Sequence, residues 1–164
     1  MRPLANTTLT VVFFDREENG LLGSRNYFQT LDPKALPSMA INLDIFGYGD
    51  TLFITASKDG PLRTALEKAA SERALPLRSV PMAQYPPSDH QSMAFAGVET
   101  LGVALIDGAE IDSVLGKGGT LPRILTIIHS DGDTMSQVRE KDIVAAIPIL
   151  ENTIRNLDAA TPAR

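Results

Sequence analysis

Residues 39–46, MAINLDIF, form an apolar run of strand length that contains one asparagine and one aspartate. A run of this kind predicts a strand buried on both faces, which is typical of a parallel sheet flanked by helices. Three further runs share this character and predict strands: LTVVFF at 9–14, TLFIT at 51–55 and TLGVALI at 100–106. A shorter strand is predicted at 75–80.

Segments of helical periodicity separate these strands. The segment 61–73 places five apolar residues on one face behind a proline that suits the first turn of a helix. Further helices are predicted at 21–30, 91–96 and 141–157, the glycine-rich segment 111–123 is expected to be irregular, and 158–164 is expected to be a frayed tail. Strands that alternate with helices indicate an α/β domain with a mostly parallel sheet, spanning 1–164 without a linker or repeat.

Composition narrows the possible functions. The chain has 164 residues, 43% of them hydrophobic and 21% charged, which suits one globular domain. A net charge of −5 argues against nucleic acid as a partner. Without cysteine, any metal must be held by His, Asp or Glu. No apolar run approaches the roughly 20 residues of a membrane span, and the first ten residues lack a signal-peptide pattern; the sequence leaves the localisation, including export of a longer protein, undetermined.

Acidic and histidine side chains lie at or just beyond the ends of predicted strands, where the chemistry of such sheets gathers. These residues are Glu17, Glu18, Asp44, Asp89, His90, His129, Asp131 and Asp133. Imidazole and carboxylate are zinc ligands, and a neighbouring free carboxylate can move the proton of an activated water. Each residue also has a structural explanation: adjacent glutamates are often solvated, and a single histidine is more often structural. For Asp44 a structural hydrogen bond and a functional role are equally compatible with the sequence.

Four motifs resemble those of the co-catalytic zinc aminopeptidases, a family that also contains glutamate carboxypeptidases and glutaminyl cyclases. FFDREENGLLGS at 13–24 is similar to the signature Glu-Glu-x-Gly-Leu-x-Gly-Ser. The other three follow in the family's order: NLD at 42–44, SDHQS at 88–92 with AGV at 96–98, and HSDGDT at 129–134. The resemblance implies a three-layer α/β fold of the zinc exopeptidase type and a peptide substrate.

The resemblance also implies a role for each matching residue. Glu17 is expected to be the general base and acid, and Glu18 and His129 to bind one zinc. Asp44 is expected to bind a second zinc. The remaining positions are expected to support the site or line the substrate pocket: Asp89, His90, Asp133, Thr134 and, as a residue facing the substrate, Tyr85.

This sequence departs from the family pattern upstream of the glutamate pair. The family carries a His-x-Asp motif and a metal-bridging aspartate there, whereas 16 residues precede Glu17 and none of them is histidine. Glu99 replaces a proline and Met93 an aromatic residue of the family pattern. We therefore expect a domain incomplete at its N-terminus that binds one zinc or none, with little turnover of its own. A fragment of a longer gene is favoured over a split protein or a degenerate homologue.

Two alternatives to a peptidase remain. A truncated homologue could act as an association module, because removal of several elements would leave apolar surface for self-association or for pairing with a missing N-terminal segment. Residues 13–18 would also fit a glutaminyl cyclase. The uninterrupted GLLGS at 20–24 favours the peptidase branch.

Overall fold

The computed structural model describes residues 3–117, 119 and 121–162. The predictions for the first two residues, for Gly118 and Thr120 within the irregular segment and for the last two residues of the tail lie outside this range. Its strands are β1 (Met39–Phe46), β2 (Thr51–Ala56), β3 (Leu77–Ser79) and β4 (Glu99–Ile106). Its α-helices are α1 (Leu22–Thr30), α2 (Pro61–Glu72), α3 (His90–Phe95), α4 (Ile111–Val114), α5 (Arg123–Ile127) and α6 (Glu140–Ala160).

The four strands form one sheet in the order β1-β4-β2-β3. β1 pairs with β4 and β2 with β3 in parallel, whereas β2 and β4 are antiparallel. β2 and β4 lie at the centre and are buried along almost their whole length. The apolar runs at 51–55 and 100–106 therefore form the two-faced buried strands that the sequence predicts.

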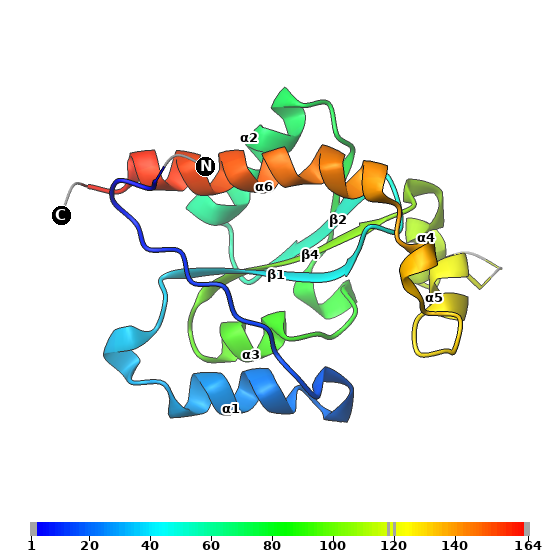
Figure 1. Cartoon of the computed structure of the whole chain (residues 1–164), viewed down its shortest axis with the longest axis horizontal. Coiled ribbons are helices and arrows are strands. Elements are labelled where there is room, and N and C mark those ends of the chain that lie inside the picture. Colours follow the sequence, from blue (N-terminus) through cyan, green and yellow to red (C-terminus); the bar gives the residue numbers. More distant parts are fainter. Residues whose placement is uncertain (1–2, 118, 120, 163–164) are drawn as a thin grey trace.

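Helices cover both faces of the sheet, so the domain has three layers (Figure 1). α2 and α6 pack on one face, where Leu66 and Ile149 meet Leu101 and Val103 in a fully buried core. α1 and α3 lie on the other face, and α4 and α5 lie beyond one end of the strands. A second core on this side surrounds Phe53. The predicted α/β class with flanking helices is confirmed.

The prediction of a buried strand at 9–14 is wrong. This segment is extended but pairs with no strand among the described residues, and it crosses in front of β1 in Figure 1. Its side chains up to Phe13 are open to solvent, with Val11 70% and Phe13 94% exposed, whereas the Phe14 ring packs against α1. High β-propensity is insufficient, because a strand forms only where a neighbour completes its backbone hydrogen bonds.

The frayed tail predicted at 158–164 is wrong at its start. α6 continues to Ala160, and Asp158 is buried on its last turn. Both carboxylate oxygens of Asp158 accept hydrogen bonds of 2.8 Å from the backbone N–H groups of Ala5, Asn6 and Thr7. The Thr7 hydroxyl donates a fourth, also of 2.8 Å. This clasp between residues 5–7 and Asp158 orders the end of the helix.

Candidate active site

The glutamate pair lies on a tight reversal of the chain. Glu17 and Glu18 begin a short 3₁₀ helix, Glu17–Asn19, between two residues in the left-handed region, Arg16 (φ 52°) and Leu21 (φ 60°). α1 then returns against the incoming chain. A Cβ atom on Gly23 would lie 2.4 Å from the Asp15 carbonyl oxygen, so this position requires glycine. The reversal brings the Glu18 carboxylate to His129 and the Glu17 carboxylate near Asp44 of β1.

Asp44 lies at an irregularity of β1. The register between β1 and β4 shifts between Leu43 and Phe46, as in a β-bulge. Ile45 has a φ of 54°, which is exceptional for a β-branched residue and costs on the order of 1–3 kcal/mol. Strain of this kind persists only where the surrounding structure enforces it. The bulge therefore changes the direction of the chain at Asp44, where the regular pairing of β1 with β4 ends.

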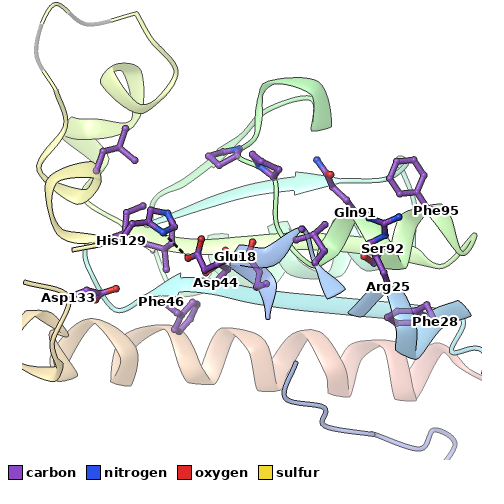
Figure 2. Close-up of a pocket in the computed structure, with 18 of the residues that line it drawn as sticks. Glu18, Arg25, Phe28, Asp44, Phe46, Gln91, Ser92, Phe95, His129 and Asp133 are labelled. Atoms are coloured by element: carbon purple, nitrogen blue, oxygen red, sulfur yellow. Dashed lines mark ion pairs between the residues drawn. The ribbon is translucent and has the colours of Figure 1, made fainter. Parts of the chain in front are cut away.

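His129 approaches the same place from the opposite end of the chain. It follows α5 and also has a left-handed backbone, with a φ of 61°. Its Nδ1 lies 2.7 Å from Oε1 of Glu18, and both side chains are more than half exposed. Figure 2 shows this pair beside Asp44. Residues more than 100 positions apart are thus brought together at one end of the sheet.

Glu17 lies among like charges. Partial burial raises the pKa of its carboxyl group above the ordinary value, and the carboxylates of Asp44, Glu18 and Asp89 raise it further. The neighbouring His129 acts in the opposite direction. A carboxyl group whose pKa is raised toward neutrality is suited to accepting and returning a proton.

A layer of buried polar side chains lies between α1, α3 and the sheet. The hydroxyl of Ser24 on α1 donates to that of Ser92 on α3 at 2.9 Å, and the Asn42 amide of β1 donates to the Ser88 hydroxyl at 3.0 Å. These bonds tie the glutamate turn and the Asp44 strand to the same loop. Asp89 is buried in this layer, and burial raises its pKa, with the nearby Ser24 hydroxyl opposing the rise.

His90 is fully buried at the start of α3. Neither ring nitrogen has a hydrogen-bond partner among the described residues. Its ring packs over Gly102 of β4, where an added Cβ would lie 3.1 Å from the ring carbon Cγ. Burial lowers the pKa of His90 to about 4, although the Asp44 carboxylate favours the charged form. His90 is therefore a neutral side chain inside the domain at pH 7.

Tyr85 also lies inside the domain. Its ring stacks on Phe53 at 4.8 Å and meets His90 edge to face at 5.3 Å. Its hydroxyl donates to the Phe53 carbonyl oxygen at 3.3 Å, and burial raises its pKa. With Asp44 and Ile45 it lines an apolar cavity of about 50 Å³ next to the acidic residues.

Asp133 and Thr134 lie in the turn that follows His129. Asp133 accepts a hydrogen bond from the Tyr48 hydroxyl, which raises the pKa of Tyr48 to about 12. The Thr134 hydroxyl pairs with that of Ser136 at 2.8 Å. Neither side chain bonds to the His129 ring among the described contacts; Asp133 instead ties this turn to the end of β1.

A broad cleft of about 1250 Å³ joins these residues. Glu17, Glu18, Asp44 and His129 all line it, whereas Asp89, His90 and Tyr85 do not. Figure 2 shows His129 and Asp133 toward one end, and Arg25, Phe28 and Phe95 toward the other. The motifs do not predict these last three. Helical spacing offers a signal for two of them, because positions 25 and 28 of a helix beginning after the glutamates share a face.

The donor atoms suit zinc in kind but not in number. Glu18 and His129 offer a carboxylate oxygen and an imidazole nitrogen, both ordinary zinc ligands. Within the described part of the chain, no three His, Asp or Glu side chains are grouped closely enough to hold a metal ion. A catalytic zinc normally has three protein ligands. The described residues thus do not form a three-ligand zinc site by themselves.

The sequence profile of Peptidase family M28 matches residues 1–152. The chain belongs to peptidase family M28. Among curated proteins none matches it.

Three solved structures resemble this M28 chain. A zinc aminopeptidase from Bacillus subtilis is 21% identical with a TM-score of 0.69, over 88% of this chain and 34% of that one. An aminopeptidase from Aneurinibacillus sp. strain AM-1 is 19% identical with a TM-score of 0.65, over 86% and 31%. The LapA aminopeptidase of Legionella pneumophila is 18% identical with a TM-score of 0.65, over 93% and 39%. At these identities the similarity establishes the fold, and the chain spans about a third of each structure.

Proposed function

We propose that this M28 chain carries part of the active site of a zinc-dependent aminopeptidase. The observation that supports this most is the meeting of Glu17, Glu18, Asp44 and His129, from three separate segments, at one end of the cleft. Each of these three segments contains a residue with strained, left-handed backbone next to or at the functional position. Backbone strain gathered at one place is characteristic of a functional site.

Different residues of the chain would bind the metal and transfer the proton. Glu18 and His129 would hold one zinc ion, and Asp44 would contribute to a second. Zinc supplies a water of lowered pKa and polarises the scissile carbonyl group. Glu17, with its raised pKa, would take a proton from the attacking water and give it to the nitrogen of the leaving amine.

The substrate proposed for this site is the N-terminal end of a peptide. The free amino group of a peptide is attracted to the acidic end of the cleft. The adjacent apolar cavity lined by Ile45, Phe53 and Tyr85 would receive an aliphatic side chain from the first residue. The uninterrupted chain from Glu18 into α1 favours this peptidase chemistry over that of the related glutaminyl cyclases.

Zinc stoichiometry tests the proposed ligands. After equilibration with zinc and gel filtration, elemental analysis should find at most about one zinc per chain, weakly held. Glu18→Ala and His129→Ala should each abolish retention, whereas Asp131→Ala, which removes an exposed acid from the same turn as His129, should not. Glu17→Gln should keep the metal and eliminate any hydrolysis of a leucine anilide. Equal zinc retention by all variants would contradict the assignment.

The exposed segment 9–14 favours association as a second candidate function. Leu9, Val11 and Phe13 are each more than half exposed, and β1 is an edge strand whose Leu43 is 48% exposed. Such a surface is suited to covering by another chain or segment. Light scattering should therefore show concentration-dependent association, which the double variant Val11→Lys, Phe13→Lys should reduce. A monomer at every concentration would exclude self-association.

A further inference from the structure

The charges along the cleft are separated. Four carboxylates line it: those of Glu17, Glu18, Asp44 and Asp133. Arg25 is the one arginine or lysine among the described residues that line it. In Figure 2, Arg25 lies away from His129 and Asp133, near Phe28 and Phe95. The cleft thus has an acidic end and a basic end.

No ion pair joins Arg25 to an acidic side chain in the described part of the chain. Arg63 on α2 illustrates the contrast, since it contacts both Asp59 and Glu67. Arg25 is exposed on α1, and Gln29, one turn further along the same helix, lines the cleft with it. Gln91 reaches the same end from α3. A guanidinium beside two amides presents several hydrogen-bond donors toward one space.

We propose that Arg25 forms a carboxylate-binding subsite that makes the cleft prefer short peptides with a carboxylate beyond the cleaved bond. A short peptide carries a positive amino terminus and a negative carboxyl terminus, and this polarity matches that of the cleft. The chain as a whole has a net charge of −5 and would otherwise repel an anionic group. Phe28 and Phe95, the latter 89% exposed, offer apolar contact for the residue that carries the carboxylate.

This inference rests on the proposed peptidase function for the direction in which the peptide lies, but its test does not require catalysis. The probes are leucyl-glycyl-glycine, its C-terminal amide, and the same amide with glutamate as third residue. Binding to the metal-free 164-residue chain would be measured by NMR titration of its backbone amides in EDTA. Zinc-dependent hydrolysis of a leucine anilide, measured separately, reports on the proposed function alone.

An exposed arginine–carboxylate contact predicts that the free acid binds about three- to fivefold more tightly than the amide. Arg25→Gln should remove this difference and Arg25→Lys should keep part of it. Arg73→Gln makes the same change of charge just after the end of α2, across the sheet, and should leave the difference intact. Raising the salt concentration to about 1 M should also reduce it, because screening weakens contacts between exposed charges.

The third probe separates the two sources of the carboxylate. If the glutamyl amide binds like the free acid, the subsite accepts an acidic side chain; if it binds like the simple amide, the subsite is specific for a free C-terminus. Equal binding of acid and amide, a difference that persists in Arg25→Gln, or failure of all three peptides to bind would overturn the proposal. If the acid is preferred and no anilide is cleaved, the subsite stands and the catalytic proposal fails.

Discussion

The buried, neutral His90 predicts a specific dependence of stability on pH. An unfolded histidine has a pKa near 6.5, whereas burial lowers the pKa of His90 to about 4 in the folded domain. Between these values the unfolded chain binds a proton at this residue that the folded chain excludes. The contribution of His90 to the free energy of unfolding is therefore undiminished above pH 6.5 and declines as pH falls. The decline is complete below pH 4.

The magnitude follows from the difference between the two pKa values. At about 1.36 kcal/mol per unit, the full loss is about 3 kcal/mol. Integration of the linkage relation gives a loss of about 2 kcal/mol between pH 8 and pH 5. This is a large fraction of the stability of an ordinary domain.

Urea unfolding at a series of pH values, monitored by circular dichroism in EDTA, measures this loss. His90→Phe keeps an aromatic ring against Tyr85 and should remove about 2 kcal/mol of the change between pH 8 and pH 5. His129 is the only other histidine, so in the control variant His129→Gln only His90 remains, and this variant should still lose stability between pH 8 and pH 5. If the free energy of unfolding changed with pH in the same way for the parent and His90→Phe, the reasoning would be refuted. His90 would then be protonated to the same extent in the folded and unfolded chains.

Two further perturbations test the packing and the clasp. Ile149→Ala should lower the free energy of unfolding by about 2–5 kcal/mol, because Ile149 is fully buried between α6 and the sheet. Ile147→Ala, at a half-exposed position of the same helix, should lower it by less than about 1 kcal/mol. Equal losses in urea unfolding would contradict the packing. Asp158→Asn should speed amide hydrogen exchange at residues 5–7 without changing exchange in β4. The control Asp112→Asn, at an exposed acid, should change exchange in neither region. Unchanged exchange in Asp158→Asn would show that other contacts hold the segment.

The sequence predicts the interior of this fold better than its margins. β2 and β4 follow from apolar runs, because a strand with neighbours on both sides and helices on both faces must be apolar throughout. The run at 9–14 is equally apolar, but it lies outside the sheet and is largely exposed. Composition reports the tendency to extend and bury, and it does not report whether a neighbouring strand is present to complete the hydrogen bonds.

The candidate site likewise has residues that the sequence predicts and features that it does not. The motifs locate Glu17, Glu18, Asp44 and His129, and the cleft brings all four together. They do not predict the bulge at Ile45, because a β-branched residue is the least expected to adopt a positive φ. Its position is enforced by tertiary structure. Arg25 is missed for another reason: its importance depends on the cleft that α1 and α3 form together, which no local pattern describes.

The Asp158 clasp has a consequence for biosynthesis. It joins backbone groups to a carboxylate 151–153 positions later in the chain. Contacts of such sequence separation require closure of a long loop and are slow to form. During translation the segment that leads to Glu17 and Glu18 emerges before α6, yet its hydrogen bonds to Asp158 cannot form until the last turn of α6 has left the ribosome. The segment that precedes the glutamate pair is thus made well before the helix to which Asp158 ties it.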